Sequence, residues 1–217
     1  MDIYQESLAD FINRMQVLLD NMERNSVIAA SMSAFGYDAA RIQEGRSQLE
    51  GLIAAEKTQV KEYSEQYAAT EAVVQAWEET NKLYGLHRAL AKRVFKGDKQ
   101  ARRALLLNER LPRKRSDWLL QAEVFYDGLL GSPERVAAMG TFGQTQAGFE
   151  TAKTAVISIK SLHSIQQDEI GEAQKATLDR DTLWVQARVW VVTAIEVAGY
   201  ALADDPQLLE SLGVVVV

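Results

Sequence analysis

The feature that most constrains the fold is an internal repeat, because the chain matches itself when it is shifted by 107 residues without a gap. A shared A-x-M-x-x-F-G string and a tryptophan pair argue against a chance match. The identical pairs include Met32 and Met139, Phe35 and Phe142, Gly36 and Gly143, Trp77 and Trp184, and Ala91 and Ala198. Two repeats of this length cover nearly the whole chain, so we predict a tandem duplication with repeats 1–107 and 108–214.

Each repeat carries the periodicity of a shorter helix followed by a very long one. Apolar residues from Leu8 to Met22 recur in steps of three and four, which predicts a helix ending near Phe35-Gly36. A second periodic run from Ile42 stops at Lys96-Gly97-Asp98. It predicts a helix of about 58 residues, roughly 87 Å long. The only prolines are Pro112, Pro133 and Pro206, so nothing interrupts these runs.

Two repeats of this kind predict an all-α fold: an antiparallel bundle of long helices with pseudo-twofold symmetry, forming a single helical domain over 1–217. Alternation typical of a strand is confined to the Val214–Val217 tail. Residues 183–203 are apolar nearly all round, which predicts burial on every side. The partners considered are the first long helix, the segments 99–107 and 206–217, or another copy of the chain. Trp77 and Trp184 are predicted to be equivalent core anchors.

The composition of the chain excludes several classes of protein. The chain has 217 residues, no Cys and a formal charge of −6, which removes disulfide scaffolds and thiolate metal sites. Its first residues, MDIYQESLAD, lack the pattern of a secretory signal. The most apolar window carries Arg188 and Glu196 in its middle, which argues against a transmembrane span and against a membrane partner. We therefore expect a cytoplasmic protein.

Charge is distributed unevenly along the chain. Residues 88–115 have a net charge of +9 and the remainder −15, while residues 196–217 hold four acidic residues and no Lys or Arg. This pattern is compatible with neutralisation inside the monomer, with assembly of copies through complementary charge, or with nucleic-acid binding, which the acidic pI of about 5.1 disfavours. The predicted interaction surface consists of Arg102, Arg103, Arg113, Lys114 and Arg115.

No familiar catalytic or metal-binding motif is present in the sequence. Di-iron bundles need Glu-x-x-His on two helices, whereas Glu65 is followed three residues on by Ala68 and Glu172 by Lys175. We expect no catalytic residue, no cofactor and no metal. Polar residues at the centres of the long helices indicate either register-fixing layers or a polar pocket. The pocket would be formed by Glu56, Gln59, His163 and Gln166.

These patterns favour a non-enzymatic intracellular helical-bundle protein that acts as a structural or protein-interaction module. We expect it to self-associate as a homo-oligomer or to bind another protein, because surplus apolar helix and opposite charges are available for contacts. The alternative is a small-ligand-binding helical bundle that uses the polar pocket near the middle of the long helices.

Overall fold

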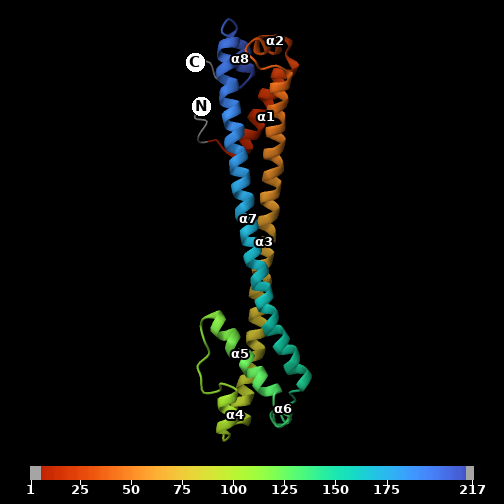
Figure 1. The fold of residues 1–217 in the computed structure, drawn as a ribbon, viewed down its shortest axis with the longest axis vertical. Coiled ribbons are helices and arrows are strands. Elements are labelled where there is room, and N and C mark those ends of the chain that lie inside the picture. The colour runs from red at the N-terminus through yellow and green to blue at the C-terminus, as the bar shows by residue number, and fades with distance from the viewer. Residues whose placement is uncertain (1–5, 214–217) are drawn as a thin grey trace. The chain divides into compact units, whose positions relative to one another are not determined.

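The computed structural model describes residues 6–213, and every regular element in that range is a helix, which confirms the predicted all-α class (Figure 1). The Val214–Val217 tail lies outside the described residues. The elements are α1 (Leu8–Arg24), α2 (Ser26–Ala34), α3 (Ala39–Val94), α4 (Lys99–Ala104), α5 (Arg115–Leu130), α6 (Pro133–Gly140), α7 (Gln146–Ala201) and α8 (Pro206–Ser211).

The first predicted helix is divided in two at Asn25. This residue is extended at φ −88° and ψ 108°, and its side-chain oxygen accepts hydrogen bonds from the backbone N–H groups of Val27 and Ile28. Asparagine is among the best N-caps because it satisfies backbone donors that the first helical turn leaves free. A new helix therefore starts at Ser26 and continues only to Ala34.

The helix boundaries recur with the spacing found in the sequence. The first residues of α1, α2, α3 and α4 are each followed 107 positions later by the first residues of α5, α6, α7 and α8. Both long helices contain 56 residues, close to the predicted length. Gly36 and Gly143, which precede them, have φ values of +85° and +73°, a backbone conformation that glycine adopts without steric cost. The duplication itself stays a prediction.

The chain forms two compact units whose limits differ from those of the predicted repeats. Unit 1 comprises residues 1–63 and 171–217, and unit 2 comprises residues 64–170. Unit 1 therefore contains α1, α2, α8, the first part of α3 and the last part of α7. Unit 2 contains α4, α5, α6 and the remaining parts of α3 and α7.

In unit 1, α1 lies against α3 and α7 (Figure 1). Its buried residues Phe11, Met15, Leu18, Leu19 and Met22 follow the predicted stripe. The two long helices run antiparallel: Tyr37, just before α3, packs on Trp190 with ring centroids 5.6 Å apart, and further along α3 Glu56 pairs with Arg180 at 3.5 Å. Gly45 is required here, because a Cβ at this position would lie 2.6 Å from the Trp190 ring.

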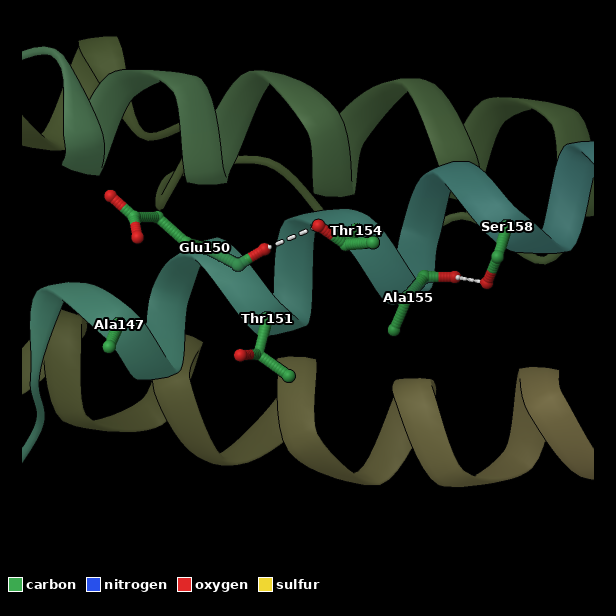
Figure 2. A pocket seen from close by; sticks show the side chains of 6 residues that line it. All are labelled: Ala147, Glu150, Thr151, Thr154, Ala155 and Ser158. Carbon is green, nitrogen blue, oxygen red and sulfur yellow. Dashed lines mark hydrogen bonds between the residues drawn. The ribbon is translucent and has the colours of Figure 1, made fainter.

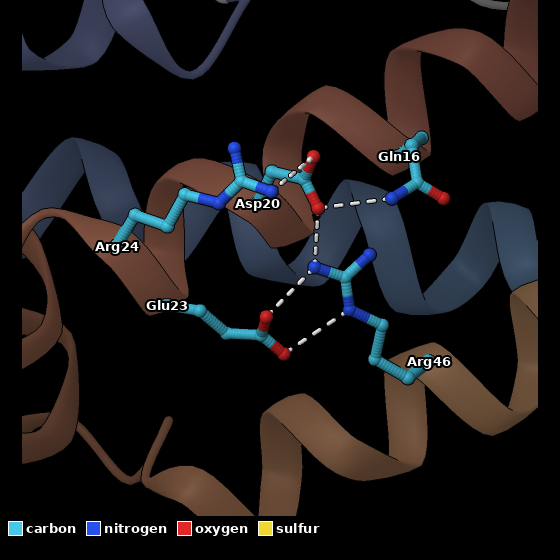
Figure 3. A network of polar contacts seen from close by, with 5 residues as sticks. All are labelled: Gln16, Asp20, Glu23, Arg24 and Arg46. Atoms are coloured by element: carbon cyan, nitrogen blue, oxygen red, sulfur yellow. Dashed lines mark hydrogen bonds and ion pairs between the residues drawn. The ribbon is translucent and has the colours of Figure 1, made fainter.

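A polar network on the surface of unit 1 joins α1 to α3 (Figure 3). The Arg46 guanidinium pairs with Asp20 and with Glu23, the second pair at 2.8 Å. Gln16 donates a further hydrogen bond to Asp20 at 2.9 Å. Hydrogen bonding to Arg46 lowers the pKa of Asp20 and of Glu23 below their ordinary values. Both carboxylates are therefore charged at neutral pH and hold the two helices in register.

In unit 2, α5 occupies the place that α1 has in unit 1. Its residues Trp118, Ala122, Phe125, Tyr126 and Leu129 are buried against α3 and α7. The long helices are antiparallel here as well. Gln166 donates a hydrogen bond to the Thr70 hydroxyl at 3.1 Å, and the rings of His87 and Phe149 lie 5.1 Å apart.

Two predictions about burial need correction. Trp77 and Trp184 are half-buried and lie beside the cores, each in edge or tilted contact with one aromatic residue of a shorter helix, Trp118 and Phe11 respectively. The segment 183–203 is not buried on every side, because the core that it joins in unit 1 packs against one face of α7. Val185, Val189 and Tyr200 remain exposed in the chain.

Candidate functional site

Five polar or aromatic side chains form a buried polar cluster in unit 2. Its members, each at most 6% exposed, are Tyr84, His87, Arg88, Gln121 and Tyr126. His87 Nδ1 and the Tyr126 hydroxyl lie 3.0 Å apart, and the Tyr84 hydroxyl donates to Gln121 Oε1 at 3.3 Å. Edge-on aromatic contacts join Tyr84 to Phe125 and His87 to Tyr126. The cluster therefore combines hydrogen bonds with aromatic packing.

Burial sets the ionisation of the cluster. Desolvation raises the pKa of Tyr84 to about 12 and raises that of Tyr126 further. It also lowers the pKa of His87 below 6.5, against a smaller opposing effect of a hydrogen bond with Gln144. At neutral pH both phenols are therefore protonated and His87 is neutral, which leaves Arg88 as the charged member.

Side chains of the cluster hold the connection between α4 and α5. Arg88 donates to the carbonyl oxygens of Leu106, at 3.0 Å, and of Glu109. Gln121 Nε2 donates to the carbonyl of Arg110 at 3.1 Å. Leu106 itself has a φ of +48°, unusual for a residue with a side chain. The chemistry of the cluster is thus the fixing of a backbone loop by buried donors.

The predicted interaction surface lies around this loop, in unit 2. Arg102 and Arg103 are on α4, Arg113 and Lys114 precede α5, and Arg115 is its first residue. Arg103, Arg113 and Lys114 are exposed, whereas Arg102 donates to Asn108 at 2.8 Å and Arg115 lies 5.8 Å from the Trp77 ring.

The charges of this region are a secondary influence on a neighbouring lysine. The pKa of Lys92 is lowered from its ordinary value, first by partial burial and then by the charges of Arg88 and Arg102. Positive charge of this kind favours contact with anionic groups.

The residues of the predicted polar pocket are distributed over both units. Glu56 and Gln59 belong to unit 1, where Glu56 pairs with Arg180. His163 and Gln166 belong to unit 2, where His163 Nδ1 lies 3.2 Å from Gln166 Oε1 and Gln166 also bonds Thr70. Each pair thus has local partners, as expected of polar layers between helices. The ligand pocket stays a prediction.

A hollow of about 520 Å³ lies along the first turns of α7 (Figure 2). It is lined by small and polar residues: Ala147, Glu150, Thr151, Thr154, Ala155 and Ser158. The Thr154 and Ser158 hydroxyls donate to carbonyls of their own helix, those of Glu150 and Ala155, at 2.9 and 2.8 Å. Their donors are thus used inside the helix, as is common for hydroxyl residues in helix interiors.

An apolar stripe runs along the outer face of α7 in unit 1. It consists of Leu178, Val185, Val189 and Tyr200, which are 66%, 62%, 63% and 75% exposed. Spacings of seven, four and eleven residues return to one side of an α-helix. The stripe lies opposite the face that carries the buried Ala187, Val191 and Ala194.

The corresponding face of α3, 107 positions earlier and in unit 2, is charged. Glu71, Glu78, Lys82 and Arg93 stand where α7 has Leu178, Val185, Val189 and Tyr200, and all four are exposed. A long helix therefore forms without apolar residues at these exposed positions. Exposed apolar patches of this kind mark contact surfaces.

Sequence reasoning missed the buried polar cluster, whereas it did identify the apolar surplus of residues 183–203 in which most of the apolar stripe lies. Tyr84 and Ala91 are core residues of α3, and His87 and Arg88 lie between them at helical spacing. A histidine and an arginine at core positions were the available signal for the cluster.

Among the described residues, none of the helices has an apolar stretch that would suffice to cross a membrane. Comparisons with protein-family models, with curated proteins and with solved structures give no match to this chain.

Proposed function

We propose that the chain is a non-enzymatic structural or protein-interaction module that self-associates. The observation that carries this proposal is the apolar stripe of α7, where large side chains are more than half exposed although the helix is fully formed. Removing such surface from water stabilises association by roughly 25 cal/mol per Å².

A tandem duplication is part of the same proposal, and recurring contacts support it. Arg46 pairs with Asp20, and 107 positions later Lys153 pairs with Asp127 at 2.6 Å. Phe11 contacts Trp184 as Trp118 contacts Trp77. In this view one ancestral helix pair produced two copies, whose surfaces then diverged.

Two surfaces are candidates for the contact between copies, and the salt dependence of association distinguishes them. Attraction through the basic residues around α4 and α5 is screened over about 8 Å at physiological ionic strength. Apolar association persists or strengthens in salt. The exposed charge of Arg103, Arg113 and Lys114 therefore predicts a salt-sensitive oligomer, and the apolar stripe predicts a salt-resistant one.

Sedimentation or light scattering over a concentration series, at low and at high salt, tests the proposal. We expect concentration-dependent self-association that survives high salt. Replacing Arg102, Arg103, Arg113 and Arg115 with Glu serves as the matched variant, and it should leave such an oligomer intact with unchanged helicity. A protein that stays monomeric at every concentration and salt level contradicts self-association.

A further inference from the structure

We propose that the apolar stripe of α7 pairs with the same stripe of a second copy, antiparallel, about a two-fold axis that crosses the stripe midway between Val185 and Val189. This inference rests on the proposed self-association and specifies its surface and geometry. An isologous contact of this type closes after two copies, because each surface is satisfied by its own equivalent.

The positions of the valines define the register. Val185 and Val189 lie two residues before and two residues after Ala187. An antiparallel pairing centred midway between the two valines therefore places Val185 of one copy against Val189 of the other, twice. Both side chains are about 60% exposed in the single chain, so the pairing covers them at the middle of the contact.

The charges on the stripe favour the antiparallel direction. Lys175 and Glu196, both exposed, lie near its two ends. In the antiparallel register Lys175 of one copy comes within about one helical turn of Glu196 of the other, a distance that a lysine side chain spans. A parallel pairing would instead place Glu196 against Glu196 and Lys175 against Lys175. The stripe is thus complementary to itself in one direction only.

The size of the stripe sets the expected strength. From Lys175 to Tyr200 a helix extends about 38 Å, and a single helix face is roughly 10 Å wide. Such a contact falls at the low end of specific interfaces, below about 1,200 Å² in total. We therefore expect a reversible dimer with a dissociation constant of about 1 μM or weaker, measured by sedimentation.

The first test transfers the residues of α3 to α7. Val185→Glu combined with Val189→Lys gives α7 the residues that α3 carries at Glu78 and Lys82. We expect the dissociation constant to rise roughly 100-fold or more, because four valine side chains leave the contact. Glu78→Gln with Lys82→Gln is the matched control and should leave dimerisation unchanged. Circular dichroism verifies that each variant is folded.

The second test determines the direction of pairing by cross-linking. Only introduced cysteines can react, because the chain contains no cysteine of its own. Gln174→Cys and Tyr200→Cys are prepared separately with different tags and mixed with a short bismaleimide. Antiparallel pairing predicts that the mixed product predominates, because identical positions are then about 39 Å apart. Predominance of the Tyr200→Cys homodimer indicates a parallel contact and overturns the inference.

The outcomes separate this inference from the proposed function. A wild-type oligomer that is unchanged by Val185→Glu with Val189→Lys uses another surface, so the inference fails while self-association stands. A wild-type protein that is monomeric at every concentration and salt level contradicts both the inference and the proposed self-association. A monomer that binds lipid vesicles through Val185 and Val189 assigns the stripe to a membrane surface and likewise overturns pairing with a second copy.

Discussion

Units 1 and 2 contain helices that start at matching positions 107 residues apart, but they distribute polar and apolar residues differently. Unit 2 has polar residues in its core, and unit 1 has apolar residues on its surface. Unit 2 buries Tyr84, His87 and Arg88 where unit 1 has Val191, Ala194 and Ile195 at the corresponding places. On the outside the relation is inverted, because α7 carries Val185 and Val189 in unit 1 where α3 carries Glu78 and Lys82 in unit 2.

This difference shows that the residues that set the ends of a helix are distinct from the residues that set the character of its faces. Caps and turns fix where each helix begins and ends, and these are shared: Asp98 and Asp205 both cap short helices, accepting from Ala101 and Leu208. The faces are free to change as long as one of them remains apolar. In unit 2 the altered face holds the loop between α4 and α5, and in unit 1 it exposes the apolar stripe of α7.

The largest effect is expected for Arg88→Ile, which gives unit 2 the residue that unit 1 has at position 195. The carbonyls of Leu106 and Glu109 would lose their buried donor. Losing a buried charged donor to two partly buried acceptors should cost about 2 kcal/mol in the free energy of unfolding, measured by urea denaturation. Ile195→Leu, the control in unit 1, should cost less than about 1.5 kcal/mol. Equal losses at both positions would remove the energetic distinction between the units.

A symmetric effect that is no larger is expected for the tryptophan pair. Trp77→Ala and Trp184→Ala should each lower the free energy of unfolding by about 2 kcal/mol, less than the 3–5 kcal/mol typical of fully buried aromatics, because both side chains are half-buried. Similar losses in chemical denaturation support equivalent roles in the two units. A loss at one position alone would argue that the two tryptophans have different packing roles in the two units.

The smallest effect is a pH dependence just below pH 6.5 that arises from His87 in unit 2. Burial holds the pKa of His87 below 6.5, so below that pH the unfolded chain binds more protons than the folded one. The stabilising contribution of neutral His87 is present above pH 6.5 and is lost as the pH falls toward its lowered value. His87→Ala, which introduces the residue found at Ala194, should flatten the stability profile just below pH 6.5. An unchanged slope in thermal melts would show that another group titrates there.

The sequence predicted the architecture better than the site. Periodic apolar residues and the glycines at 36, 97 and 143 define the long helices, since local conformation alone decides where a helix can continue. The break at Asn25 depends on one side chain folding back on the backbone, which periodicity does not report. The half-burial of Trp77 depends on how far α5 covers α3. The buried cluster needs tertiary partners from α5, so the core-facing positions of His87 and Arg88 were the only sign of it in the sequence.

The division of the chain between the units has a consequence for the order of synthesis. Unit 2 is one continuous segment, residues 64–170, whereas unit 1 requires residues from both ends of the chain. A ribosome synthesises every partner of the Phe125 core before it has made Trp190. The apolar face of α1, with Phe11, Met15 and Leu18, must wait for the last part of α7 to arrive. Domains generally fold as units when their residues have emerged. Unit 2 is therefore the natural first folding nucleus, and the N-terminal helix is the part of the nascent chain most in need of protection.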